Sequence, residues 1–535
     1  MQDEKKLYIT TPIYYPSAKL TIGNCYTTIC CDAISRFHKM LGYDVFFMTG
    51  TDEHGQKIQK KALEKGVSEK QFLDEIVNDT KDLWTKLKID YSRFIRTTDE
   101  DHLKVASEVF RKLYEKGEIY KTEYKGKYCT PCESFWTEDQ LVDGMCPDCG
   151  RPVEDMSEEC YNFRLSKYTD KILELYKDQP EFLQPQSRVN EMVNNFLKDG
   201  LKDLCVSRQS VSWGVQVPFD PKHTIYVWID ALTNYLTGLG YMSDDESNFE
   251  KFWPADVHIV GKEIVRFHAI IWPALLMALD LPVPKRILGH GWLLFGNDKL
   301  SKSKEAGVVE VFDPRILFQR YGADSIRNFI IGEVTFGQDG PYSQEIFLNA
   351  YNTNLANKIG NLVSRTTGMV NKYNGGVIES DRTISNELFA ELKNNVLKLK
   401  EESINLMKEF KLTQSYQKVL DIVDLGNKFV DDYEPWVKNK DENCKEELKE
   451  FLHLLSEVNI IACTMLLPFL PESIPNAFAK FGLEVPTTFD EFTKFGTIAN
   501  GTQVDKGDNL YERLDVVKEN AELVEIAKEQ KMLNK

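Results

Sequence analysis

The sequence predicts an α/β fold: a Rossmann-like parallel-sheet domain carrying a small metal-binding insertion, followed by an all-α bundle. Three observations predict it. Strand-like and helix-like runs alternate near the N-terminus, two Cys-x-x-Cys pairs lie close together in the next segment, and apolar residues recur at helical spacing towards the C-terminus. A chain of 535 residues is too long for a single core, so we expect several domains.

The first half of the parallel-sheet domain is expected over residues 1–115. KLYIT predicts a strand, residues 23–41 carry apolar side chains at threes and fours, and DVFFMT predicts a second strand. Strand–helix–strand order of this length predicts a right-handed parallel crossover. The same alternation resumes over residues 226–290, where we expect the second half. No GxGxxG follows the first strand, so a dinucleotide fold of the dehydrogenase kind is not supported.

Residues 116–225 interrupt this pattern and are expected to form the insertion. Cys129 and Cys132 make one CxxC pair, and Cys146 and Cys149 make another. Four thiolates suit one tetrahedral Zn²⁺ ion, and a full set of four leaves no open position for water. We therefore expect one structural zinc, in preference to a catalytic zinc or to four unrelated cysteines.

The last part of the chain is predicted to be helical. Residues 291–344 link the sheet domain to this part, and residues 345–499 carry apolar side chains at threes and fours, which predicts a helical bundle. Residues 500–535 are polar and strongly charged, and we expect a docked helix or a loose tail there.

Two short segments are candidates for binding a triphosphate. Thr21, Gly23 and Asn24 lie where the first strand meets the first helix, and a helix N-terminus favours phosphate. Lys299-Leu-Ser301-Lys302-Ser lies on a loop after an apolar strand, where two lysines can neutralise phosphate oxygens. Taken alone, each segment also fits a simpler interpretation. The first can be an ordinary capped helix start, and the second can be a solvated loop.

Composition limits the classes of function and the compartment. The net charge of −17 argues against a nucleic-acid binder, although a large acidic protein can carry a local basic face. The sequence has no apolar run of about 18 residues and no signal peptide, so we expect a cytoplasmic protein without a membrane span. Disulfides are not expected among its 11 cysteines, because that compartment is reducing.

Nearly the whole chain resembles the bacterial methionyl-tRNA synthetases, a class I aminoacyl-tRNA synthetase family with a four-cysteine zinc knuckle. The segments Thr21–Asn24 and Lys299–Ser303 correspond to the signatures usually written HIGH and KMSKS. Further motifs follow in family order: TTPIYYPSAKLTIGN, GTDEHG, YCTPCESFWTEDQLVDGMCPDCGRPVE, YVWIDALTNY, GKEIVRFHAIIWPALL and GHGWL.

The resemblance implies a methionine–tRNA ligase with two reaction steps. Methionine and ATP, with Mg²⁺, would give methionyl-adenylate and pyrophosphate, and methionine would then pass to the 3′-terminal adenosine of tRNA(Met). It implies catalytic roles for Thr21, Asn24, Lys299 and Lys302, and ATP contacts from these residues with Gly23 and Ser301. Asp52 would hold the α-ammonium group. The implied methionine-binding residues are Ile13, Tyr15, Asp52, Trp228, Ala231, Leu232, Tyr235, Ile264, His268 and Trp272.

The resemblance also implies how tRNA is recognised. Residues 345–499 would be the anticodon-binding domain, in which Asn361, Arg365 and Trp436 contact the anticodon, and residues 291–344 would hold the KMSKS loop and a stem-contact region. An Asn and an Arg can bond exposed base edges, and a Trp can stack an unpaired base. A helix-capping Trp and a surface Arg are the simpler alternative. We expect elongator and initiator tRNA(Met) as partners, and a monomer.

The sequence departs from the family pattern at both signatures. Thr21 and Asn24 replace two histidines, Leu300 replaces a methionine, and Lys304–Gly307 differs from the usual continuation. Both replacements of histidine are hydrogen-bond donors, so we expect activity. Two alternatives stay open: an enzyme that activates methionine for an acceptor other than tRNA, and an inactive RNA-binding or regulatory protein.

Overall fold

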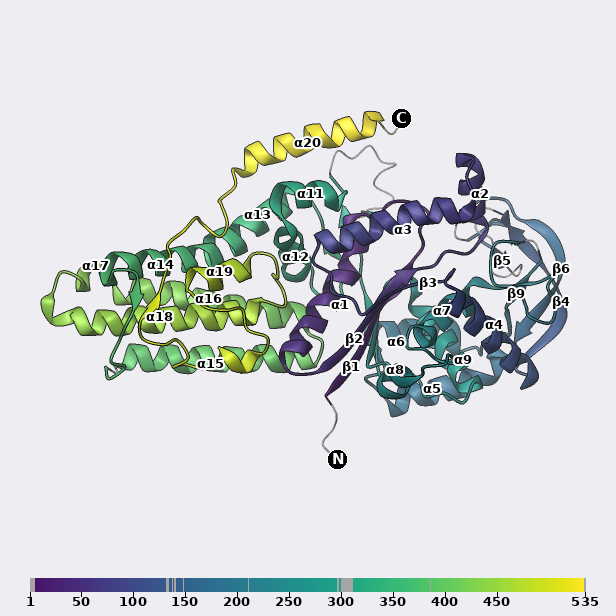
Figure 1. The fold of residues 1–535 in the computed structure, drawn as a ribbon. Helices are drawn as coiled ribbons and strands as arrows, with labels where there is room; N and C mark the ends of the chain where they lie inside the picture. Colours follow the sequence, from purple (N-terminus) through teal and green to yellow (C-terminus); the bar gives the residue numbers. More distant parts are fainter. Residues whose placement is uncertain are drawn as a thin grey trace.

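A six-stranded parallel sheet forms the centre of the N-terminal half (Figure 1). The computed structural model describes residues 5–130, 134–136, 138, 141–147, 149–209, 211–295, 298–299, 311–384 and 386–533. The strand order is β3-β2-β1-β11-β12-β7, and every neighbouring pair is parallel. The strands are β1 (Lys6–Tyr14), β2 (Asp44–Thr51), β3 (Arg93–Arg96), β7 (Leu183–Gln184), β11 (Val257–Gly261) and β12 (Ile287–His290).

Helices cover both faces of this sheet, as its apolar strands require. α1 (Ile22–Met40) packs on β1, β2 and β11, and it also contacts α12 (Ala323–Gly332), so that α1 is buried nearly all round. The helices of this half are α1, α2 (Gln56–Lys65), α3 (Glu69–Lys86), α4 (Glu100–Glu115), α7 (Val227–Thr237), α8 (Ser247–Phe252) and α9 (Trp272–Ala278). The predicted parallel α/β architecture is confirmed.

The carboxyl ends of the central strands meet at one edge of the sheet, which is where open α/β sheets bind ligands. β1 ends at Tyr14, just before the Thr21–Asn24 segment, and β2 ends at Thr51, just before Asp52. β11 ends at Gly261 and leads directly into the segment that carries Ile264 and His268. The topology thus collects residues that lie far apart in the sequence.

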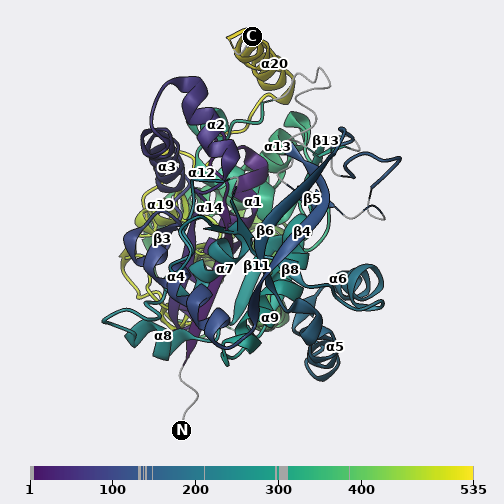
Figure 2. The same ribbon diagram turned by 90° about the vertical axis from the view of Figure 1, so that its right-hand side faces the viewer.

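The insertion is a separate antiparallel sheet with strand order β5-β4-β6-β8 (Figure 2). One short strand of the same region, β7, instead joins the edge of the central sheet beside β12. A strand of two residues is too short to show a periodicity in the sequence. The elements are β4 (Ile119–Cys129), β5 (Ser134–Trp136), β6 (Glu154–Phe163), α5 (Thr169–Asp178), α6 (Gln186–Met192), β8 (Leu204–Cys205), β9 (Ser207–Arg208) and β10 (Thr224–Ile225).

The C-terminal half is helical, as predicted (Figure 1). Long antiparallel helices form the bundle, and α20 lies against α13, where Leu523 is fully buried. The main helices are α11 (Pro314–Tyr321), α12 (Ala323–Gly332), α13 (Gln344–Ala350), α14 (Asn361–Asn374), α15 (Glu387–Lys408), α16 (Leu412–Tyr433), α17 (Pro435–Lys438), α18 (Lys445–Leu466), α19 (Ile474–Lys480) and α20 (Val516–Leu533). Short strands are β13 (Leu293–Phe295), β14 (Asp298–Lys299), β15 (Gly340–Pro341), β16 (Val377–Ile378) and β17 (Thr502–Gln503).

A buried ion pair joins the two halves. Nη1 of Arg327, on α12, lies 2.7 Å from Oδ2 of Asp32, on α1, and both side chains are fully buried. The same guanidinium donates to the backbone carbonyls of Phe469 (2.7 Å) and Pro468 (3.0 Å), just past the end of α18. These bonds satisfy a charge that burial alone would strongly disfavour. They fix α1 to the bundle. Within the described part of the chain, no helix has the length and apolar character needed to cross a membrane.

Candidate active site

The start of α1 presents hydrogen-bond donors at the carboxyl edge of the sheet. Thr21 is the N-cap residue, and the carboxamide oxygen of Asn24 accepts from its backbone N–H (2.9 Å) and its hydroxyl (3.1 Å). These two bonds fix the Asn24 side chain with its oxygen towards Thr21. Its amide nitrogen has no acceptor among the described residues. Thr21, Gly23 and Asn24 are all half-buried. The positive end of the helix dipole and this free donor suit an anion.

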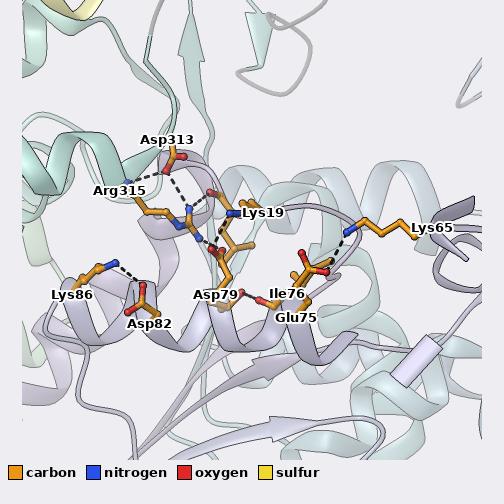
Figure 3. Close-up of polar contacts among 11 residues, drawn as sticks. Lys19, Lys65, Glu75, Ile76, Asp79, Asp82, Lys86, Asp313 and Arg315 are labelled. Atoms are coloured by element: carbon orange, nitrogen blue, oxygen red, sulfur yellow. Dashed lines mark hydrogen bonds and ion pairs between the residues drawn. The ribbon is translucent and has the colours of Figure 1, made fainter. Parts of the chain in front are cut away.

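The chain beyond the Lys/Ser loop is tied to the segment before α1 (Figure 3). Arg315 of α11 donates from Nη1 to the carbonyl of Leu20 (3.2 Å) and forms an ion pair with Asp79 of α3. Lys19 reaches the same carboxylate at 3.3 Å. The backbone N–H of Ile22, the first residue of α1, donates to the carbonyl of Phe312 (3.0 Å). One flank of the Lys/Ser loop is therefore held beside the start of α1.

The other flank of the loop is β14, in which the backbone of Lys299 pairs with that of Leu294. Ser301 and Lys302 lie outside the described residues, as does the Lys304–Gly307 segment.

Asp52 directly follows β2, and its backbone N–H donates to the carbonyl of Tyr14 (2.9 Å). Its Oδ1 atom is buried and accepts no hydrogen bond from any described residue. Burial, reinforced by the negative charge of Asp230, raises the pKa of Asp52 well above its usual value. A buried carboxylate oxygen without a partner is costly in an isolated protein, and a bound cation would satisfy it.

The next carboxylate, Glu53, is instead fully paired. Its oxygens accept from Arg96 (2.7 and 3.0 Å) and from Thr51 (2.6 Å), and its side chain is fully buried. Trp213 donates from Nε1 to its backbone carbonyl (2.7 Å). These contacts fix the loop after β2, so that the Asp52 carboxylate is held in one place.

A buried hydrogen-bonded pair lies on α7 and on the segment after β11. The Tyr235 hydroxyl lies 2.7 Å from Nε2 of His268, and Nδ1 of His268 lies 2.9 Å from the carbonyl of Ile264. A carbonyl can only accept, so Nδ1 carries the proton and Nε2 accepts from Tyr235. Burial lowers the pKa of His268 to about 4, which keeps the ring neutral. The Tyr235 and His268 side chains therefore form a fixed, uncharged surface.

Most of the expected methionine-binding residues lie together. Trp228 stacks on Phe267 with ring centroids 3.5 Å apart, and it remains half-buried. Trp272 is 1% exposed and donates to Nε2 of His258 (3.3 Å), so it serves mainly as core packing behind the pair. Ala231 is also buried, on the same helix as Trp228. One core cluster contains or contacts Ile13, Trp228, Leu232, Tyr235, Ile264 and Trp272.

Tyr15 is the exception. It packs with Trp213 against a different small cluster formed by Ile58, Phe72 and their neighbours on α2 and α3. The ammonium of Lys57 lies 5.8 Å from its ring centre. In this structure Tyr15 therefore does not share the core cluster that holds Tyr235 and Trp272.

Sequence reasoning missed several polar residues of this region. His258 stacks on Tyr235 (4.2 Å) and bonds the Thr10 hydroxyl (2.7 Å). Asp230, His54 and His102 form a buried hydrogen-bonded group. The available signal was a polar residue inside an apolar run, as in DVHIV and YVWID. Nothing in the sequence indicates which distant residues pair with it.

The insertion brings cysteine thiols together. Sγ of Cys129 lies 3.5 Å from Sγ of Cys149, and the thiols of Cys129, Cys146 and Cys149 all lie within 4.8 Å of one another. Thiolates that share one tetrahedral Zn²⁺ at about 2.3 Å lie roughly 3.8 Å apart. The spacing therefore fits a zinc site. Cys132, the expected fourth ligand, lies outside the described residues.

A second group of possible metal ligands is already neutralised. Glu159, Asp220 and His223 lie close enough together to hold an ion. The ammonium of Lys121 lies between the two carboxylates, 2.7 Å from Glu159 and 2.9 Å from Asp220. We assign this group to an ion-pair network.

The expected anticodon residues lie at one end of the bundle. Asn361 donates to Asn427 (2.9 Å), and Arg365 forms an ion pair with Asp431 (2.6 Å), so α14 and α16 run side by side in the same direction. Trp436 lies in α17, which follows directly after the end of α16, and 44% of its surface is exposed. An exposed Trp can offer a stacking surface to an unpaired base.

Comparisons with known proteins agree with this geometry. A family model described as "tRNA synthetases class I (M)" matches residues 7–160 and 152–367. The chain is 50% identical over 530 residues to the methionine–tRNA ligase of Clostridium acetobutylicum, covering 99% of this chain and 81% of that protein. It is 52% identical over 520 residues to that of Caldanaerobacter subterraneus subsp. tengcongensis, covering 97% and 81%. The methionyl-tRNA synthetase of Mycobacterium tuberculosis, solved with methionyl-adenylate, superposes with a TM-score of 0.89 at 37% identity, covering 95% of this chain and 100% of that one.

Proposed function

This chain belongs to the methionyl family of class I tRNA synthetases, and from that premise we propose which of its residues carry the reaction. It is an enzyme that activates L-methionine with ATP and transfers the methionyl group to tRNA. Its residue roles, metal ions and choice of tRNA are the proposal.

Asp52 binds the α-ammonium group of methionine. The unpartnered, buried Oδ1 atom is the single observation that best supports this role, because an ammonium ion would supply the missing donor and the missing charge. A bound cation also favours the ionised carboxylate, against the burial that raises its pKa.

The methionine side chain lies against the wall formed by Tyr235 and His268. Because the Tyr235 proton points to His268, the pair offers an apolar, polarisable surface rather than a free donor. Ile13, Trp228, Ala231, Leu232 and Ile264 complete the pocket, and Trp272 supports it from behind the Tyr235–His268 pair. Tyr15 would reach it by turning away from the α2–α3 cluster when methionine binds.

ATP lies over the start of α1. The methionine carboxylate oxygen attacks the α-phosphorus, and the bond from that phosphorus to the β-phosphate oxygen breaks, releasing pyrophosphate. Asn24 donates its free amide N–H to phosphate, Thr21 holds Asn24 in place, and Gly23 allows close approach to the backbone. Lys299 and Lys302 neutralise the leaving phosphates with Ser301, and Mg²⁺ would add positive charge there.

In the second step, a ribose hydroxyl of the terminal adenosine of tRNA attacks the methionyl carbonyl carbon. The bond from that carbon to the adenylate oxygen breaks, and AMP leaves with it. Arg365 and Asn361 bond anticodon bases, and Trp436 stacks on one, in elongator and initiator tRNA(Met) alike. A structural Zn²⁺ held by Cys129, Cys132, Cys146 and Cys149 would stabilise the insertion. A monomer in the cytoplasm remains a prediction from the sequence.

The proposal is tested by methionine-dependent ATP–pyrophosphate exchange, followed in the same preparation by charging of tRNA(Met). We expect both reactions, with one zinc per chain by elemental analysis. Exchange without charging would support activation for another acceptor. If a folded, zinc-replete sample shows neither exchange nor charging, the roles given to Thr21 and Asn24 are wrong.

A further inference from the structure

A buried group of three side chains connects the two ends of the methionine site. Oδ2 of Asp230 accepts from Nδ1 of His54 (2.6 Å), and Oδ1 accepts from Nε2 of His102 (2.8 Å). The exposed fractions of the three side chains are at most 6%. A carboxylate that accepts from two rings at once, one on each oxygen, has little freedom to rotate.

The three residues come from three different elements. His54 lies two residues after Asp52, in the loop after β2. Asp230 lies on α7, between Trp228 and the pair Ala231 and Leu232. His102 lies in the first turns of α4. The group therefore binds the loop that holds the ammonium to the helix that forms the side-chain pocket, and it fastens both to α4.

The charges around Asp52 point to the same connection. Asp230 faces it from α7, and His54 and Glu53 face it from its own loop. Glu53 is neutralised by Arg96 of β3. The attraction of Asp230 and its hydrogen bond outweigh the effect of burial on His54, whose pKa is raised. Against the effect of burial, the two histidines hold the pKa of Asp230 at about 2. Positive charge on His54 would offset the repulsion between the Asp52 and Asp230 carboxylates.

We propose that Asp230, held between His54 and His102, is a positioning residue that sets the distance between the ammonium anchor and the side-chain pocket. The enzyme thereby selects an amino acid of one length. This rests on the proposed roles of Asp52 and of the α7 pocket. None of the three residues needs to touch methionine for this effect, because each acts through the element that carries it.

The test measures ATP–pyrophosphate exchange with methionine, with S-methylcysteine, which is one methylene shorter, and with ethionine, which is one methylene longer. The variants are Asp230→Asn, His102→Leu and His102→Gln. Asparagine keeps the size of Asp230 but removes its charge. Its amide N–H would face the N–H of His54 or of His102, so one of the two hydrogen bonds is lost. Glutamine can still donate to Asp230, and leucine cannot.

We expect Asp230→Asn and His102→Leu to raise the KM for methionine about tenfold, the effect of losing one hydrogen bond to a buried charge, without changing the KM for ATP. In these two variants, the ratio of kcat/KM for methionine to kcat/KM for each analogue should fall. In the His102→Gln variant, this ratio should stay close to that of the unchanged enzyme. The matched control is Thr233→Val on α7. Its buried hydroxyl donates to the carbonyl of Ile229 in the same helix, so the variant should change neither the KM for methionine nor the preference for methionine over the analogues.

The proposal is overturned if the Asp230→Asn and His102→Leu variants keep the same preference for methionine over its analogues. It is also overturned if the KM for methionine and the KM for ATP rise equally, because that result indicates a general loss of structure in the active site. If Asp230→Asn does not fold, the two His102 variants decide. Asp52→Asn, measured alongside, separates two kinds of failure. If it leaves the KM for methionine unchanged, the proposed role of Asp52 is wrong. If it raises that KM while the other variants do not, only the positioning role is wrong.

Discussion

The proposed methionine pocket and the proposed tRNA-binding end of the bundle are built in opposite ways. In the pocket, Tyr235, His268 and Trp272 are at most 2% exposed and bond one another or their neighbours. At the end of the bundle, Trp436 is 44% exposed, and Arg365 pairs with an Asp431 side chain that is 63% exposed. A small ligand is selected by a closed set of fixed groups, and a macromolecule by exposed groups on a rigid support.

This difference has a consequence for mutations. In the closed pocket a change at one side chain disturbs its partners, because interiors are tightly packed and polar groups there lack water. On the exposed face, a change removes one contact and leaves the support intact. The two regions should therefore respond to different assays, unless the joint between them is damaged.

The largest effect is expected at that joint. Arg327→Met removes the guanidinium from its buried ion pair with Asp32 and should lower the free energy of unfolding by about 3 kcal/mol or more. Thermal unfolding followed by circular dichroism measures it as a lower melting temperature. The control is Lys39→Met on the same helix α1, where an exposed ion pair with Asp90 contributes about 0–1 kcal/mol. Equal shifts for both variants would show that Arg327 is not what joins the two regions.

The next effect belongs to the pocket. Asp52→Asn should lower kcat/KM for methionine in pyrophosphate exchange about a hundredfold, close to 2.7 kcal/mol, because it removes the charge that binds the ammonium. Asp82→Asn is the control, an exposed carboxylate on α3 paired with Lys86. The KM for tRNA should stay the same in both variants.

A smaller effect is expected on the bundle. Trp436→Ala should raise the KM for tRNA about tenfold, since stacking of one base contributes roughly 1–3 kcal/mol. Pyrophosphate exchange should not change. Val437→Ala, at the neighbouring residue, which is 49% exposed, should alter neither assay. A loss of exchange in the Trp436 variant would break the distinction between the two regions.

The smallest effect is expected from the loss of one hydrogen bond inside the proposed methionine pocket. Tyr235→Phe removes the hydroxyl that donates to His268 and should raise the KM for methionine about fivefold, near 1 kcal/mol. Tyr416→Phe, which loses a buried hydrogen bond to Asn328 in the C-terminal half, should leave that KM unchanged. If the two variants behave alike, the Tyr235–His268 pair has no particular part in binding methionine.

The same contrast explains what could be predicted from the sequence. The parallel sheet and the bundle follow from periodicity, because each long element repeats its apolar pattern several times. The edge strand β7 has only Leu183 and Gln184 and offers no pattern. It joins the sheet through β12, about a hundred residues further along the chain.

Most residues of the methionine site were predicted only because their motifs resemble those of a family. Asp52 and Trp436 were predicted in this way, and Trp436 lies exposed as a stacking residue requires. The cysteine site was predicted from the spacing of its two CxxC pairs. The partners of Asp230 were not found, because His54 and His102 lie 176 and 128 residues away from it. Only the folded chain brings them together. The direction of the Tyr15 ring, towards α2 and α3, was equally inaccessible to local pattern.

The most direct measurement compares Asp52→Asn and Trp436→Ala in both assays, pyrophosphate exchange and tRNA charging, on the same preparations. We predict that Asp52→Asn loses methionine activation and with it charging, whereas Trp436→Ala keeps exchange and loses only charging through a higher KM for tRNA. If Trp436→Ala lost exchange as strongly as Asp52→Asn, or if Asp52→Asn kept normal exchange, methionine activation and tRNA recognition would not reside in the two separate regions described.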